Sequence, residues 1–231
     1  MAASSAAGAR CPALFLASMP ARRAALPTDA SSGKAVSGKA GLRRIARANR
    51  ARLAGAPATA AANGLAQAGF AALAPFLPAS GGAVAGYWPV RGELDPLALL
   101  RRLHEAGRRL ALPAVLPGGG MEFRLWTPAT EMTAGAFDIP VPPPHSGVME
   151  APDILLVPLL AFDRQMYRLG YGGGFYDRAL ARLRRERPQT LAFGLAFGEQ
   201  EAAPLPREAH DQPLDGVLTP AGLIAGAERQ A

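Results

Sequence analysis

Residues 154–161, with the sequence ILLVPLLA, form a continuous apolar run that limits the possible folds more than any other segment. The run has no polar position that could face water, so we expect a strand that is buried on both faces. Such strands lie at the centre of mostly parallel sheets. Segments with strand patterns and helix patterns alternate along the chain, which favours helices on both faces of that sheet. The sequence therefore predicts a three-layer α/β fold.

The other elements are predicted from apolar periodicity and from residues that begin or end helices. Ser37 is a capping residue for the first helix, and Asp95 with Pro96 supplies an N-cap and a first-turn proline for a later one. Predicted helices cover residues 37–53, 60–73, 95–105 and 175–187. Predicted strands cover residues 82–88, 109–115, 122–126, 154–161, 190–197 and 217–219.

The chain has 231 residues, of which 49% are hydrophobic, and this suits a single domain with one sizeable core. We expect the domain to cover residues 37–225, with a tail at residues 226–231. Residues 1–36 are rich in Ala, Ser, Gly and Arg without sustained apolar periodicity, which predicts a disordered N-terminal extension. An apolar patch at residues 13–19 is similar to a short targeting segment, so targeting stays open beside a dispensable extension.

The formal net charge of +7 is concentrated near the N-terminus. Residues 1–53 contain 10 basic residues and 1 acidic residue, whereas the rest of the chain contains 15 basic and 17 acidic residues. The body of the protein lacks the positive excess that tracks a nucleic-acid backbone, so we expect no nucleic-acid partner. Residues 154–162 are far shorter than the roughly 20 residues of a membrane-spanning helix, so we expect no membrane segment. A single cysteine, Cys11, excludes an intrachain disulfide and fits a cytoplasmic protein.

We expect a glycine-rich segment, RLGYGGGFYDR at residues 168–178, to follow the strand of the apolar run directly and to lead into a predicted helix. Four glycines within five residues let backbone N–H groups crowd toward an anion, and the following helix presents its positive end there. The spacing matches neither the Walker lysine loop nor the dinucleotide-binding fingerprint. Asp177, near the helix start, could hold Mg²⁺ beside bound phosphates. The alternative for the segment is a flexible turn. The alternative for Asp177 is an acid at the helix start that interacts favourably with the helix dipole.

Several motifs resemble those of the 5-formyltetrahydrofolate cyclo-ligase family, whose members are also called 5,10-methenyltetrahydrofolate synthetases. RLGYGGGFYDR is similar to the ATP loop of that family nearly residue for residue, with Phe175 where tyrosine is common. VPLLAFDRQMYRLG, Lys39-x-x-Leu42-Arg43, GYWPVRGELDP and HDQPLDGVLT also resemble family motifs and occur in the family's order. The resemblance spans about residues 37–219 and implies an α/β domain of the NagB/RpiA-like type.

The resemblance implies an ATP- and Mg²⁺-dependent cyclisation of 5-formyltetrahydrofolate to 5,10-methenyltetrahydrofolate, with release of ADP and phosphate. In that family the formyl oxygen attacks the γ-phosphate, and the neighbouring folate nitrogen then attacks the activated carbon. An amide-like oxygen is a poor leaving group until it is phosphorylated, and phosphoryl transfer depends on positioning and on cations. We expect a monomer whose partners are these small molecules.

Roles for individual residues are implied in the same way. By this resemblance, Lys39 and Arg43 would reach the ATP phosphates. Their four-residue spacing puts both cations on one face of the helix. The nucleotide loop would consist of Arg168, Leu169, Gly170, Tyr171, Gly172, Gly173, Gly174, Phe175 and Tyr176. Catalysis would rest on Lys39, Arg168 and Asp177. A solvated basic helix face is the alternative for Lys39 and Arg43.

The metal ion and the folate are assigned by the same resemblance. Asp177 and Asp211 would hold Mg²⁺ together with phosphate oxygens and waters. Trp88 would stack on the pterin, and Glu93 would pair with N–H donors of its ring. The alternatives are that Trp88 belongs to the core, that Glu93 caps a turn and that Asp211 begins one.

Other residues are expected to shape the site or to lie outside it. Phe137 and residues 139–144 are expected to line the pocket, and His210 to position other groups. His104 and His145 are expected on the surface. Two other functions stay open: an ATP-dependent kinase or ligase for another small anionic metabolite, and a non-catalytic sensor of a nucleotide or sugar phosphate.

Overall fold

The computed structural model describes residues 38–53 and 58–225. The helices are α1 (Lys39–Leu53), α2 (Ala58–Leu73), α3 (Leu97–Glu105) and α4 (Phe175–Glu186). The strands are β1 (Ala83–Ala85), β2 (Arg109–Val115), β3 (Met121–Trp126), β4 (Thr133–Ala134), β5 (Pro140–Val141), β6 (Ile154–Pro158), β7 (Ala161–Phe162), β8 (Arg168–Leu169), β9 (Leu191–Leu195), β10 (Gly216–Thr219) and β11 (Gly222–Ala225). The predicted extension at 1–36, the capping residue Ser37 and the tail at 226–231 lie outside the described residues.

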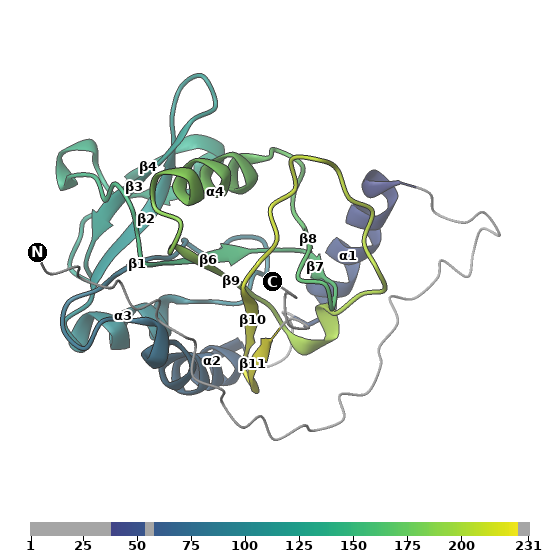
Figure 1. The fold of residues 1–231 in the computed structure, drawn as a ribbon, viewed down its shortest axis with the longest axis horizontal. Helices are drawn as coiled ribbons and strands as arrows, with labels where there is room; N and C mark the ends of the chain where they lie inside the picture. Colours follow the sequence, from purple (N-terminus) through teal and green to yellow (C-terminus); the bar gives the residue numbers. More distant parts are fainter. Residues whose placement is uncertain (1–37, 54–57, 226–231) are drawn as a thin grey trace, which may run out of the picture.

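The central sheet has seven strands in the order β11-β10-β9-β6-β1-β2-β3. The five inner strands, from β10 to β2, run parallel, whereas β11 and β3 pair antiparallel at the two edges. In Figure 1, α4 lies on one side of this sheet and α2 and α3 lie on the other. The predicted α/β fold with a mostly parallel sheet and helices on both faces is confirmed.

The side chains of β6 divide between two hydrophobic cores, one on each face of the sheet. Ile154 and Leu156 pack with buried leucines of α2 and α3, whereas Leu155 and Val157 pack with those of α4. All four side chains are fully buried. Successive side chains of a strand point to opposite faces, so a strand between two helical layers needs apolar residues at every position.

The glycine loop does not follow the central strand directly, and the prediction on this point is wrong. Strand β6 ends at Pro158, and the β7–β8 hairpin intervenes before the loop. Asp163 folds the chain back, because its Oδ1 accepts hydrogen bonds from the N–H groups of Gln165 at 2.9 Å and Tyr167 at 3.0 Å. Its other carboxylate oxygen accepts a bond from the N–H group of Leu205 at 3.0 Å.

The predicted strand at 154–161 ends three residues early, at Pro158, and two more predicted strands are also longer than those observed. Strand β1 covers residues 83–85 instead of 82–88, and the segment after it is held by a bond from the Tyr87 hydroxyl to the Leu94 carbonyl at 2.6 Å. Strand β9 covers residues 191–195 instead of 190–197, because the N–H group of Phe197 donates to Gln200 Oε1 at 2.8 Å and begins a turn.

The remaining differences concern element ends and strands that were not predicted. Strand β2 has the predicted bounds, and β3 is one residue longer at its start. Helix α3 begins at Leu97 rather than Asp95, although Asp95 Oδ1 accepts a hydrogen bond from the N–H group of Leu97 at 2.8 Å. Strand β11 was not predicted, and it pairs with β10.

Helix α1 lies away from the sheet, beside the β7–β8 hairpin (Figure 1). Ala46 of this helix packs in a third buried cluster with residues of the hairpin and its flanks, which include Leu160, Ala161, Leu169 and Leu205. This packing fixes α1 next to the glycine loop. No helix within the described ranges is both long enough and apolar enough to cross a bilayer.

Candidate active site

A cavity of about 460 Å³ opens at the carboxyl ends of the central strands. Its walls include Val115 and Pro158, the last residues of β2 and β6, together with residues of α1 and the start of α4. The residues for which the sequence suggested binding or catalysis all line this cavity. They are Lys39, Arg43, Trp88, Glu93, Arg168, Leu169, Gly170, Tyr171, Gly172, Gly173, Gly174, Phe175, Tyr176, Asp177 and Asp211. The fold thus brings distant segments to one place, as expected for a ligand site on a parallel sheet.

The glycine loop, residues 170–174, turns sharply between β8 and α4. Gly172 and Gly174 have φ angles of 105° and 64°, which residues with a side chain rarely adopt. A Cβ atom at Gly172 would lie 3.3 Å from the guanidinium carbon of Arg43, so the loop backbone passes close to that cation. Within the described ranges, no backbone carbonyl accepts a hydrogen bond from the N–H groups of residues 170–174. These amides at the start of α4 can therefore face an anion.

Helix α1 directs two cations toward this loop. Arg43 Nε donates a hydrogen bond to the carbonyl oxygen of Gly170 at 3.0 Å. Lys39 Nζ donates to Asp211 Oδ2 at 2.7 Å and lies 3.3 Å from Glu208 Oε1. The Lys39 side chain is only 14% exposed, so it does not lie on the solvated side of the helix.

Asp211 is held in its ionised form by its neighbours. Burial opposes ionisation, but it is outweighed by the hydrogen bond from Lys39, by the backbone N–H of Glu208 and by nearby positive charge, which together lower the pKa of Asp211. The N–H group of Glu208 donates to Asp211 Oδ2 at 2.8 Å. Asp211 therefore accepts a bond within a turn and also faces the cavity, so the turn role and the site role coexist.

Arg168 and Asp177 form a pair at the start of α4. Arg168 Nη2 donates to Asp177 Oδ1 at 2.7 Å, and Arg168 Nη1 donates to the carbonyl oxygen of Gln212 at 2.7 Å. The N–H group of Gln212 also donates to Asp177 Oδ1, at 3.0 Å. Burial lowers the pKa of Arg168, and the charge of Asp177 opposes this shift. Because Gln212 follows Asp211, the two predicted metal ligands belong to one connected cluster.

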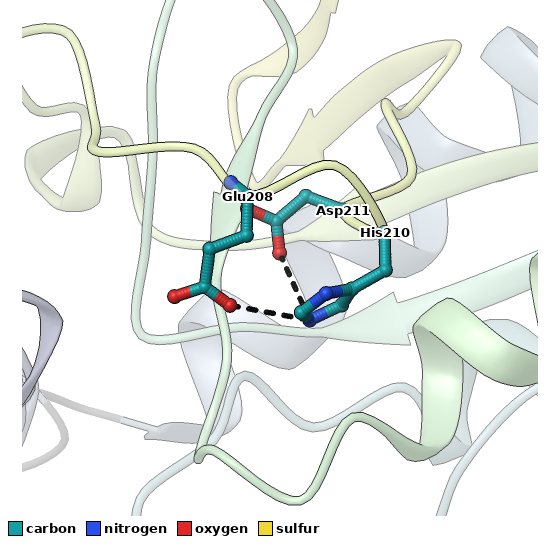
Figure 2. A group of neighbouring side chains, drawn as sticks. All are labelled: Glu208, His210 and Asp211. Atoms are coloured by element: carbon teal, nitrogen blue, oxygen red, sulfur yellow. Dashed lines mark hydrogen bonds and ion pairs between the residues drawn. The ribbon is translucent and has the colours of Figure 1, made fainter.

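The oxygens in this cluster suit a hard divalent cation. In the part of the chain that the structure describes, no hydrogen bond or ion pair engages Asp177 Oδ2. Figure 2 shows a second group, Glu208, His210 and Asp211, whose possible ligand atoms lie within 4.8 Å of one another. Glu208 and His210 have side chains that are 53% and 67% exposed. Mg²⁺ prefers carboxylate, phosphate and water oxygens, so Asp177 and Asp211 fit it better than the imidazole of His210 does.

Glu93 lines the cavity and belongs to a hydrogen-bond network that the sequence did not reveal. Its Oε2 accepts a hydrogen bond from the N–H group of Val90 at 3.0 Å, and its Oε1 accepts one from the Tyr171 hydroxyl at 2.5 Å. Arg50 of α1 lies 3.8 Å from the same Oε1 and donates to the Tyr171 hydroxyl and, at 2.8 Å, to the carbonyl oxygen of Arg91. Glu93 therefore closes a turn, as the alternative assignment stated, and also lines the cavity.

Arg50 was missed because an arginine on an arginine-rich helix is usually assigned to solvent. Its side chain is only 3% exposed. A signal was present: Leu42, Ala46 and Arg50 are spaced by four residues, and the first two pack in the cluster beneath α1. That spacing places Arg50 on the buried side of the helix.

Aromatic side chains line the rest of the cavity. Trp88 is partly buried, packs against the hydrophobic core on the α2–α3 side of the sheet and also lines the cavity, so it belongs to both. Phe137, between β4 and β5, is 63% exposed, and its ring lies edge-on to that of Phe175 with centroids 6.2 Å apart. Phe137, Ile139 and Val141 line the cavity as expected, whereas Pro140 and residues 142–144, which were also expected there, do not. His104 and His145 are exposed, also as expected.

The fold and the position of the cavity define an α/β enzyme with a glycine loop at the carboxyl edge of a mostly parallel sheet. The sequence model described as the 5-formyltetrahydrofolate cyclo-ligase family matches residues 35–220, and the chain belongs to this family. The motif resemblance noted in the sequence is thereby confirmed.

Curated relatives support this membership. The chain is 36% identical over 146 residues to the 5-formyltetrahydrofolate cyclo-ligase of Escherichia coli K12, a match covering 59% of this chain and 77% of the relative. It is 33% identical over 158 residues to the cyclo-ligase of Mycolicibacterium smegmatis, a match covering 64% of this chain and 79% of the relative.

Solved structures show the same architecture. The NMR structure of 5,10-methenyltetrahydrofolate synthetase from Aquifex aeolicus superposes with a TM-score of 0.65 and 28% identity, over 84% of this chain and 95% of that one. A 5,10-methenyltetrahydrofolate synthetase from Mycoplasma pneumoniae superposes with a TM-score of 0.63 over 79% of this chain and 98% of that one. The identity in the second case is 23%, so this likeness shows the fold alone.

Proposed function

We propose that this protein cyclises 5-formyltetrahydrofolate to 5,10-methenyltetrahydrofolate with ATP and Mg²⁺, releasing ADP and phosphate. The observation that carries the proposal is that one cavity is lined by the glycine loop, by basic side chains of α1 that include Lys39 and Arg43, by Asp177 and Asp211, and by Trp88 and Glu93. This arrangement offers a phosphate site next to a site for a flat heterocycle. Family membership supports the same reaction.

The phosphate half of the proposed site consists of the glycine loop and the cations that face it. The loop amides would bind phosphate oxygens directly, and Lys39, Arg43 and Arg168 would neutralise the charge that develops during transfer. Lys39 is paired with Asp211 and Arg168 with Asp177. These ion pairs keep both cations in place, so little reorganisation is needed when a triphosphate enters.

Mg²⁺ would be held by Asp177 and Asp211 and by phosphate oxygens. When bound, the ion would neutralise phosphate charge and help to orient the γ-phosphate for attack. Asp177 Oδ1 already accepts hydrogen bonds from Arg168 and Gln212, and these bonds orient the carboxylate.

The folate half consists of Trp88, Glu93 and the aromatic side chains near the cavity mouth. Trp88 would stack on the pterin, and Glu93 would accept hydrogen bonds from its ring N–H groups. An ionised carboxylate has about four acceptor positions, and Tyr171 and Val90 occupy one on each oxygen. Acceptor positions on both oxygens therefore remain for a ligand.

The proposed reaction needs two substitutions in sequence. The formyl oxygen attacks the γ-phosphorus, and the bond from that phosphorus to the leaving oxygen of ADP breaks. The neighbouring folate nitrogen then attacks the formyl carbon, loses its proton, and the former formyl oxygen leaves with the phosphate. The protein contributes by aligning the two substrates and by stabilising negative charge at the transferred phosphoryl group. We also propose that the protein acts as a monomer.

The test is an absorbance assay of purified protein with 5-formyltetrahydrofolate, ATP and Mg²⁺. We expect the methenyl chromophore to appear only when all three are present, with one ADP formed for each product. ADP formation without the chromophore in a screen of other anionic metabolites would favour the kinase or ligase alternative. Ligand binding without any turnover would favour the sensor alternative.

A further inference from the structure

Tyr171 connects the two halves of the cavity. It belongs to the glycine loop, between Gly170 and Gly172, yet its hydroxyl donates a hydrogen bond to Glu93 Oε1 at 2.5 Å. Burial raises the pKa of Tyr171, and the adjacent charge of Glu93 raises it further, so the hydroxyl keeps its proton and donates. The backbone of this residue therefore belongs to the nucleotide side and its side chain to the folate side.

Arg50 fixes both partners of this contact. It donates to the Tyr171 hydroxyl, and its guanidinium carbon also lies 5.2 Å from the centre of the Tyr171 ring. It donates to the carbonyl oxygen of Arg91 at 2.8 Å, within the turn that precedes Glu93. Arg91 has a φ angle of 52°, a conformation that residues with a side chain rarely adopt. Arg50 thus supports the conformation that directs Glu93.

The Glu93 carboxylate depends on these neighbours for its charge. Burial raises the pKa of Glu93, and the Tyr171 hydrogen bond, the Val90 N–H and the charge of Arg50 oppose that shift. The side chains of Arg50 and Glu93 are 3% and 4% exposed, so water cannot easily replace a lost partner. Movement of Tyr171 with the loop would therefore change both the direction of Glu93 and its capacity to accept hydrogen bonds.

We propose that Tyr171 and Arg50 are positioning residues that couple the two substrates, so that ordering of the glycine loop around a triphosphate increases the affinity of Glu93 for the reduced folate. The inference rests on the proposed function. Coupling between two binding sites is reciprocal, so bound folate increases the affinity for the nucleotide by the same factor. Tyr171 transmits the effect, and Arg50 sets the geometry of the contact.

The experiment measures the affinity for 5-formyltetrahydrofolate by calorimetry, with and without a non-hydrolysable ATP analogue and Mg²⁺. In the wild-type protein we expect the analogue to tighten folate binding by about 5- to 150-fold, the usual range for coupled sites. Tyr171→Phe should bring this factor close to one, because the ring is kept and the hydroxyl that donates to Glu93 is lost. Arg50→Lys keeps the charge but loses the planar donor set, and it should give an intermediate factor.

Tyr167→Phe is the matched control, because Tyr167 lies in the β7–β8 turn outside the cavity, where its ring contacts Arg207. It should keep the wild-type coupling factor. A wild-type factor in Tyr171→Phe, or no coupling in the wild-type protein, would overturn the inference even if the methenyl product forms. Absence of both folate binding and product in the wild-type protein would overturn the proposed function as well, which separates the two failures. Melting curves of both Tyr171→Phe and Arg50→Lys establish that each variant is folded.

Discussion

The ammonium group of Lys39 lies 2.7 Å from a carboxylate oxygen of Asp211, although 172 positions of the chain separate the two residues. Lys39 comes from the first described helix and Asp211 from the loop before β10. The contact joins residues from both ends of the fold in the lining of the cavity, where we propose that the phosphates bind. It also means that each residue orients the other before any ligand binds.

Lys39→Ala should raise the KM for ATP about tenfold or more, because a charge-assisted hydrogen bond to phosphate is lost. The variant also leaves Asp211 without its partner on α1. Steady-state kinetics with varied ATP at saturating folate would measure the effect. Arg52→Ala is the control, since Arg52 is an exposed cation on the same helix. Equal KM values for ATP in the two variants would show that Lys39 does not contact the ATP phosphates.

Asp177→Asn should lower kcat/KM by about 100-fold or more, the scale expected when an electrostatic contact in phosphoryl transfer is removed. The amide keeps the size of the side chain but loses the charge that pairs with Arg168. The Mg²⁺ concentration for half-maximal activity should rise at the same time. Asp138→Asn, at an exposed position, should behave as wild type. Near-normal turnover of Asp177→Asn at saturating Mg²⁺ would show that Asp177 does not hold the ion.

Gly172→Ala should weaken ATP binding without unfolding the protein. The φ angle of 105° disfavours alanine, at a cost on the order of 1 kcal/mol, and the new methyl group would press on the Arg43 guanidinium. Gly170→Ala is a matched control, because its φ is not in the positive region and a Cβ there meets no atom within 4 Å. Similar nucleotide affinities in both variants would argue against a tightly shaped loop.

Glu93→Gln should raise the dissociation constant for 5-formyltetrahydrofolate by about 10- to 100-fold, since hydrogen bonds to a charged acceptor contribute roughly 1.5–3 kcal/mol. Its affinity for ATP in the absence of folate should change much less, because Glu93 contacts the side-chain hydroxyl of Tyr171 rather than the backbone of the glycine loop. Glu131→Gln, an exposed acid, is the control. A larger increase in the dissociation constant for ATP than in that for folate would contradict the assignment of Glu93 to folate binding.

The stability difference between wild type and Asp211→Asn should depend on pH. The pKa of Asp211 is lowered in the folded protein from 3.8, so its ionised form stabilises the fold above that pH, and this contribution is lost as the pH falls through the folded pKa. At pH 6 the melting temperature of the wild-type protein should therefore exceed that of Asp211→Asn, by no more than about 4 °C for a largely buried ion pair. The two melting curves should converge below pH 3.8. A gap that persists or widens in acid would contradict the assigned shift.

The sequence predicts best those features that depend on local pattern. The apolar run of β6, the bounds of β2 and the glycine loop follow from residues close together in the chain. The β7–β8 hairpin was missed because Asp163 is satisfied in part by Leu205, 42 positions away. A hydrogen bond between such distant residues leaves no periodic pattern in the local sequence.

The residues of the candidate site also divide into those that local sequence motifs predicted and those that only the fold revealed. Family-like motifs selected residues that the fold then gathered around one cavity, yet Arg50 belongs to none of those motifs. Its position depends on the packing of α1 against the hairpin and on a turn at Arg91 that the sequence alone does not place. A buried arginine on a helix rich in arginines becomes apparent only when its partners are known.

The most direct test of the account uses substrate labelled with ¹⁸O at the formyl oxygen, under single-turnover conditions with ATP and Mg²⁺. Mass spectrometry of the released phosphate follows the fate of that oxygen. The account predicts one ¹⁸O in each phosphate and one methenyl product for each ADP. Unlabelled phosphate, or ADP formed without methenyl product, would contradict it.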